Sequence, residues 1–131
     1  MNSRTIVDTH ECGSRINQET IDLYRSVGVS RPIAVVLTCM AVSPKRTTSV
    51  QIEQMSGLRQ PEVSVAMKTL IERGWVEITD EIQKNGKGRP IKYYSLITPL
   101  EEIMASIEYS AIQQSQQILH TITKLKARVL A

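Results

Sequence analysis

Basic residues gather in one short segment of this 131-residue chain. Nine consecutive residues, 84–92, contain four Lys or Arg and no acid, whereas the other 12 basic residues are outnumbered by the 13 acidic ones. The four are Lys84, Lys87, Arg89 and Lys92. Lysine and arginine donate hydrogen bonds to phosphate oxygens, and the interspersed Gly86 and Gly88 permit close approach of a backbone. The net charge of +3 therefore lies in a segment suited to phosphate contact.

The residues around this segment predict a β-hairpin with a basic tip. β-prone residues occur at 75–78 and at 91–96, on either side of the turn-rich stretch 84–90, in which Asn85-Gly86 is a common hairpin turn. An isolated tip of this composition is usually just solvated. Next to a DNA-binding element it is expected to contact a backbone or a minor groove, where arginine is favoured.

Helical periodicity and stop signals predict four helices before the hairpin. The expected bounds are Asn17 to Gly28, Ser30 to Ser43-Pro44, Thr48 to Gly57, and Gln60-Pro61 to Gly74. In the first three, apolar contacts are expected from Ile21, Tyr24 and Val27, from Ile33, Val36, Leu37 and Met40, and from Val50, Ile52 and Met55. Helix, short turn, helix and basic hairpin is the order of a winged helix-turn-helix.

The fourth helix has an apolar side and a polar side. Its core side is expected to hold Val63, Ala66, Met67, Leu70 and Ile71. A recognition helix enters the major groove with its N-terminal end first, so the predicted DNA contacts are Arg59, Gln60, Ser64, Val65 and Lys68. Gln can bind adenine, Arg guanine, and an exposed Val a thymine methyl.

Further DNA contacts are predicted near this helix. Lys45, Arg46 and Thr48 belong to the loop before the third helix, whose hydroxyls can also cap that helix. Glu62 has two interpretations: it accepts from cytosine, or it stabilises the helix N-terminus through the macrodipole.

The chain resembles archaeal winged-helix transcriptional regulators of the broad MarR, ArsR and TrmB group over about residues 20–98. The strings that carry the resemblance are Gly28-Val29-Ser30-Arg31-Pro32, Ser56-Gly57-Leu58-Arg59-Gln60-Pro61-Glu62-Val63-Ser64, Glu72-Arg73-Gly74-Trp75-Val76 and Gly86-Lys87-Gly88-Arg89-Pro90-Ile91-Lys92-Tyr93-Tyr94. The resemblance implies sequence-specific, usually dimeric DNA binding. The chain departs from metal-sensing ArsR members because it has no dense Cys/His cluster.

A long last helix is predicted from Thr98-Pro99-Leu100-Glu101, which combines a capping box with proline at the first helical position, to Val129. One stripe along it comprises Leu100, Met104, Ile107, Ala111, Gln114, Ile118, Ile122, Leu125 and Val129. Such a helix must bury its stripe on its own domain or on a second copy, and its length favours a homodimer. Acids at its start and bases at its end suit the dipole and also antiparallel pairing. Gln114 either pairs near the two-fold axis or is solvated.

Other classes of function find little support. The paired spacing of a metal site is lacking in the candidate ligands Asp8, His10 and Cys12, with Cys39 or His120. Residues 1–16 are expected to be a flexible arm. Catalytic motifs and cofactor-binding motifs are absent from the sequence, as is any apolar run long enough to span a membrane. Two cysteines fit a reducing compartment, with Cys39 as a small core residue, so a cytoplasmic protein is expected.

The sequence therefore predicts a mainly α fold with a small β-hairpin. Residues 1–16 form an arm, 17–97 a winged helix and 98–131 a dimerisation helix. The predicted function is transcriptional regulation as a homodimer on double-stranded DNA, without enzymatic activity or cofactor. The alternative is a winged helix for protein contact within a transcription or modification complex. The sequence names no small-molecule effector.

Overall fold

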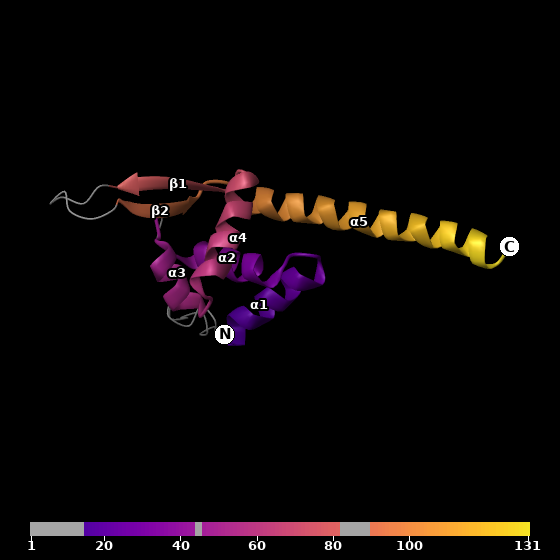
Figure 1. The fold of residues 1–131 in the computed structure, drawn as a ribbon, viewed down its shortest axis with the longest axis horizontal. Helices are drawn as coiled ribbons and strands as arrows, with labels where there is room; N and C mark the ends of the chain where they lie inside the picture. The colour runs from indigo at the N-terminus through magenta and orange to yellow at the C-terminus, as the bar shows by residue number, and fades with distance from the viewer. Residues whose placement is uncertain (1–14, 44–45, 82–89) are drawn as a thin grey trace. The chain divides into compact units, whose positions relative to one another are not determined.

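A computed structural model describes residues 15–43, 46–81 and 90–131. The chain divides into two compact units, Met1–Pro99 and Leu100–Ala131. Within the described residues of the first unit, four helices precede a two-stranded antiparallel sheet, and the second unit is one helix (Figure 1). The elements are α1 (Arg15–Ser26), α2 (Arg31–Val42), α3 (Ser49–Ser56), α4 (Gln60–Glu72), β1 (Val76–Glu81), β2 (Ile91–Leu96) and α5 (Leu100–Val129).

Helix α2 is the centre of the first unit. It contacts α1, α3, α4 and β2, and every residue from Ala34 to Met40 is buried. The sequence predicts one apolar face here, but the helix is covered nearly all round, and Ile33 at its start is only half-buried. Pro32 lies in the first turn as expected, since its missing N–H needs no partner there. Ser30 occupies the N-cap position, although its side chain makes no capping hydrogen bond.

Glycines end three of the helices as predicted. Gly57 directly follows α3, whereas Gly28 and Gly74 are the second residues after α1 and α4. Their φ angles are all positive: 99° at Gly28, 77° at Gly57 and 78° at Gly74. At Gly57 the backbone N–H donates to the Glu53 carbonyl oxygen at 2.9 Å. Only glycine adopts this left-handed conformation without a steric penalty, so these local signals were sufficient to locate the turns.

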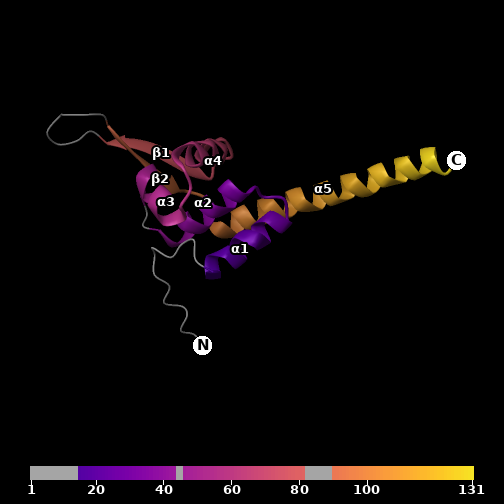
Figure 2. The same ribbon diagram turned by 60° about the horizontal axis from the view of Figure 1, so that its bottom comes forward.

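The hairpin follows α4 directly. Val76 pairs with Leu96, Ile78 with Tyr94 and Glu81 with Ile91 in one continuous antiparallel register. At its base Trp75 is buried, its N–H donates to the Leu70 carbonyl oxygen, and its own carbonyl oxygen accepts from the Ile97 N–H. In both views the hairpin extends from the helices of this unit (Figures 1 and 2).

Helix α5 contains the long predicted stripe. It begins at Leu100, one residue after Pro99, and runs for 30 residues. Ile103 and Ile107 in its first turns are its buried residues, and Ile103 is not in the predicted stripe. The stripe residues from Ile118 onward are exposed. Ile112 and Leu119 are also exposed, each next to a stripe residue, so the apolar surface of α5 is wider than predicted.

Some local predictions were wrong. Asn17 is not the N-cap of the first helix, because α1 already begins at Arg15, inside the expected arm. Val27 and Val50 were expected to make apolar contacts but are exposed, and Val27 lies just past the end of α1. Pro61 is the second helical residue rather than the first. These errors concern helix ends, where residue preferences are weak.

Cys39 differs in its chemistry from the prediction. It is fully buried in α2 as expected, but it is disulfide-bonded rather than a reduced core thiol. The only other cysteine of the chain, Cys12, lies outside the described residues. In the part that the structure describes, no helix is both long and apolar enough to cross a membrane.

Candidate nucleic-acid interface

Helix α4 presents two chemically distinct sides. Val63, Ala66, Met67 and Leu70 are buried, as predicted, and Ile71 is half-buried. All five predicted DNA contacts of this segment are exposed: Arg59, Gln60, Ser64, Val65 and Lys68. Val65 is 66% exposed, although valine normally favours burial. The helix therefore offers a solvent-facing surface with amide, hydroxyl, cationic and apolar groups.

The N-terminus of α4 is fixed by a side chain that the sequence left with two interpretations. Glu62 Oε1 accepts a hydrogen bond from the Arg59 backbone N–H at 3.0 Å. Arg59 has the extended conformation of an N-cap residue, with φ −85° and ψ 159°. A carboxylate in the first helical turn also interacts favourably with the helix dipole. This geometry favours the helix-stabilising interpretation of Glu62 over a base contact.

The loop before α3 forms a single antiparallel β-bridge with β2. Thr47 donates its N–H to the Tyr94 carbonyl oxygen at 3.0 Å and accepts from the Tyr94 N–H at 2.7 Å. Thr47 is almost completely buried. One threonine in a loop carries no strand pattern, so this pairing leaves no signal in the sequence.

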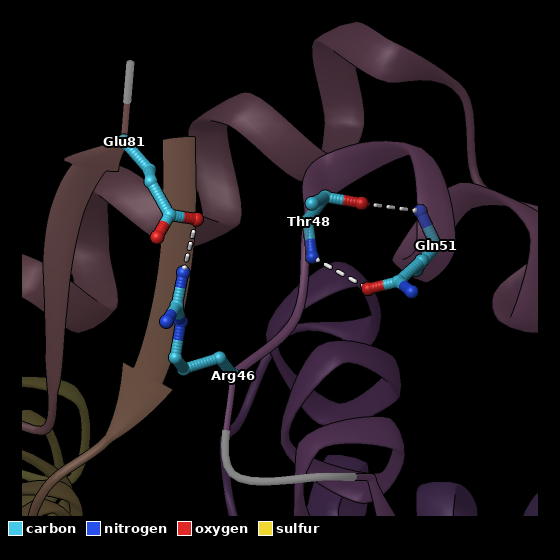
Figure 3. A network of polar contacts seen from close by, with 4 residues as sticks. All are labelled: Arg46, Thr48, Gln51 and Glu81. Carbon is cyan, nitrogen blue, oxygen red and sulfur yellow. Dashed lines mark hydrogen bonds and ion pairs between the residues drawn. The ribbon is translucent and has the colours of Figure 1, made fainter. Parts of the chain in front are cut away.

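Arg46 joins the same loop to both strands of the hairpin. Its Nη2 lies 2.9 Å from Glu81 Oε1 on β1, and its guanidinium carbon lies 3.9 Å from the centre of the Tyr93 ring on β2. Figure 3 shows the Arg46 side chain directed along the strand toward Glu81. The predicted DNA contact Arg46 is thus held by two protein side chains, and no sequence signal identified either partner.

Thr48 caps α3 in a reciprocal arrangement. The Gln51 N–H donates to Thr48 Oγ1 at 3.2 Å, and Gln51 Oε1 accepts from the Thr48 N–H at 2.9 Å (Figure 3). Gln51 Oε1 also accepts from the Thr47 hydroxyl at 3.0 Å. The predicted capping by this loop is confirmed, and the Thr48 hydroxyl has a structural role at the start of α3.

The predicted wing contacts are only partly within the described structure. Lys84, Lys87 and Arg89 lie outside the described residues, as does Lys45, a predicted contact in the loop before α3. Lys92 is exposed on β2, where its register partner is Asp80 on β1. Burial raises the pKa of the Tyr94 phenol, and the Asp80 carboxylate adds to that rise. Within the described ranges, no three His, Cys, Asp or Glu side chains are grouped as metal ligands would be.

The arrangement resembles solved structures of two transcriptional regulators. A possible transcriptional regulator from Methanosarcina mazei Go1 has a TM-score of 0.55 and 13% identity, over 82% of this chain and 86% of that one. The transcriptional regulator PA3341 has a TM-score of 0.53 and 21% identity, over 89% of both chains. No protein-family model and no curated protein sequence matches the chain. At these identities the likeness concerns the fold.

The chain thus combines a helix-turn-helix, α3 and α4, with an antiparallel hairpin and a long C-terminal helix. The predicted fold class is confirmed: a mainly helical winged helix-turn-helix fold, which the chain shares with these regulators.

Proposed function

We propose that this protein is a sequence-specific, DNA-binding transcriptional regulator that acts as a homodimer. The observation that carries the proposal is the exposed surface of α4, formed by Gln60, Ser64, Val65 and Lys68. These groups match the donors, acceptors and methyl groups on base edges in the major groove. The MarR, ArsR or TrmB type, an archaeal origin and a cytoplasmic location remain predictions from the sequence.

The hairpin supplies a second contact in this proposal. β1 follows α4 after three residues, so the basic tip belongs to the same unit as the recognition helix. Lys84, Lys87, Arg89 and Lys92 would neutralise phosphates beside the groove that α4 occupies. Phosphate contacts orient a protein on DNA, whereas base contacts select the sequence.

A second copy of the chain is the proposed occupant of the α5 stripe. Ile118, Ile122, Leu125 and Val129 recur at helical spacing and are exposed. Acids lie in the first turn, Glu101 and Glu102, and bases in the last, Lys126 and Arg128. An antiparallel pair of α5 helices would place these opposite charges together while burying both stripes.

A salt titration tests DNA binding. If the two wings of a dimer neutralise eight phosphates, the logarithm of the binding constant should fall against the logarithm of salt concentration with a slope of roughly −7. Binding without salt dependence, or no binding to any duplex, would contradict the proposal and favour a winged helix used for protein contact. Selection of bound duplexes from genomic fragments then gives the operator and its half-site spacing.

A further inference from the structure

We propose that Arg46 is a positioning residue that fixes the hairpin to the helix-turn-helix, and not the DNA contact that the sequence predicts. The Arg46 clamp, as we call it, consists of Arg46, Glu81 and Tyr93. This inference rests on the proposed function, because it concerns how the two DNA-binding elements are held together.

The guanidinium group of Arg46 is engaged on two sides. One edge pairs with Glu81, and the flat face lies over the Tyr93 ring, within the range of a cation–π contact. Glu81 and Tyr93 are on different strands but on the same face of the sheet, because Tyr93 pairs with Thr79, two residues from Glu81. Only arginine has both a planar face for stacking and a row of donors at its edge.

The Arg46 clamp holds the end of the hairpin nearest the basic tip. A two-stranded hairpin is marginally stable by itself in water, and Glu81 pairs with Ile91 at the end of the described ladder nearest the basic tip. A tilt at this pair would displace every residue beyond it. The adjacent Thr47–Tyr94 backbone pair and the Thr48–Gln51 cap continue the connection from the hairpin into α3.

Each contact of the clamp is weak by itself. The ion-paired side chains are 47% and 58% exposed, so water and salt compete with their attraction. The Arg46 clamp, the Thr47–Tyr94 bridge and the Thr48–Gln51 cap involve three consecutive residues, 46–48, and therefore reinforce one another. Loss of Arg46 should loosen the hairpin without unfolding the core, which contains neither Arg46 nor Glu81.

Amide hydrogen exchange of the free protein provides the first test. Arg46→Gln should speed exchange of the Thr47 and Tyr94 amides roughly 5-fold, as expected for losing an exposed ion pair and a cation–π contact. The matched control Arg25→Gln removes another exposed arginine, in α1, and should leave both rates unchanged. The Trp75 amide, which donates to the buried Leu70, reports whether the core is intact. Unchanged Thr47 and Tyr94 exchange in Arg46→Gln would overturn the clamp.

Binding to a mixed-sequence 30-base-pair DNA duplex provides the second test. If Arg46 positions the hairpin, Arg46→Lys and Arg46→Gln should weaken binding to a similar extent, roughly 5-fold, because lysine keeps the charge but cannot stack as a plane. If Arg46 instead contacts a phosphate, Arg46→Lys should retain the affinity and the salt slope of the unsubstituted protein. That outcome would contradict the proposal.

Replacement of two glutamates of β1 distinguishes a positioning role of Arg46 from a phosphate contact by whether DNA affinity falls or rises. Glu81→Gln should bind the duplex more weakly than its matched control Glu77→Gln, which removes an exposed acid from the same face of β1. Tighter binding by Glu81→Gln than by Glu77→Gln would mean that a released Arg46 binds phosphate, and would overturn the clamp. If the unsubstituted protein binds no duplex, the proposed function fails, and amide exchange alone decides the role of Arg46.

Discussion

The Thr98 hydroxyl donates a hydrogen bond to the Gly74 carbonyl oxygen at 2.9 Å. Gly74 ends α4, and Thr98 follows β2 by two residues. This bond therefore joins the segment before β1 to the segment after β2, next to the backbone hydrogen bond from Ile97 to Trp75. Predicted from the sequence as the start of a capping box, Thr98 instead joins the two ends of the hairpin through its side chain.

Replacing Thr98 with valine should lower the free energy of unfolding by about 1 kcal/mol, the usual contribution of one hydrogen bond. Valine keeps the shape and β-branching of threonine, so the loss isolates the bond. Urea unfolding measures the change, and Thr98→Ser, which retains the hydroxyl, is the control. A Thr98→Val protein as stable as the Thr98→Ser protein would show that the bond contributes nothing.

The turn between α3 and α4 depends on the backbone conformation of Gly57. A Cβ placed there meets no atom within 4 Å, so the positive φ of 77° is the only obstacle to another residue. Gly57→Ala should therefore destabilise the fold by about 1 kcal/mol, and Gly57→Asn by less, because asparagine tolerates the left-handed region better. Thermal unfolding of the two variants gives the order, and the reverse order would contradict this account.

Substitutions on the buried and the exposed side of α4 should separate stability from DNA recognition. Leu70 is fully buried, so Leu70→Ala should reduce stability by about 2–5 kcal/mol. Val65→Ala, on the exposed side, should change stability by less than about 0.5 kcal/mol but alter the preferred duplex, since it removes a contact for the thymine methyl. Gln60→Ala should also change the preferred sequence. Unaltered preference in both exposed variants would contradict base contact by this face of α4.

The fold should lose stability in alkaline solution. Burial raises the pKa of the Tyr24 phenol above its ordinary value of 10.0, and burial with the Asp80 charge raises that of Tyr94. Each neutral phenol therefore contributes stability that is fully present below about pH 10 and is lost as the pH rises through the raised pKa. Urea unfolding at pH 9 and pH 11 should show a smaller loss for Tyr94→Phe than for Tyr109→Phe, an exposed control. Equal losses would refute the contribution of Tyr94.

Self-association should depend on the stripe of α5. The double variant Ile118→Glu, Ile122→Glu introduces like charges that a paired stripe cannot bury, so light scattering should give the mass of one 14.7 kDa chain instead of two. The control Gln116→Glu, His120→Glu adds the same acids on the opposite side of the helix and should remain dimeric. A dimer that persists in the first variant would exclude the stripe as the interface.

The sequence predicted those features that depend on a few adjacent residues. The glycines at 28, 57 and 74, the capping loop at Thr48 and the polar side of α4 all followed from local rules of backbone conformation and periodicity. The order of these elements was enough to indicate the fold class.

The contacts that assemble the interface could not be predicted in the same way. Glu81 is 35 residues from Arg46, and Thr47 pairs with a strand nearly 50 residues away. Contacts between residues so far apart in the sequence produce no helical or strand periodicity by which they could be recognised. Arg46 was therefore assigned by its charge alone, and the burial of Ile103, one position away from the predicted stripe, was also missed.

Trp75 gives this protein an internal optical reporter. It is the only tryptophan of the chain, it is buried between the end of α4 and the start of β1, and the Arg73 guanidinium carbon lies 5.1 Å from its ring centre. Tryptophan emission shifts to longer wavelength when the indole becomes hydrated. Fluorescence of the unlabelled protein therefore monitors the junction between α4 and the hairpin, so that loosening of this junction can be followed during a titration without any attached dye.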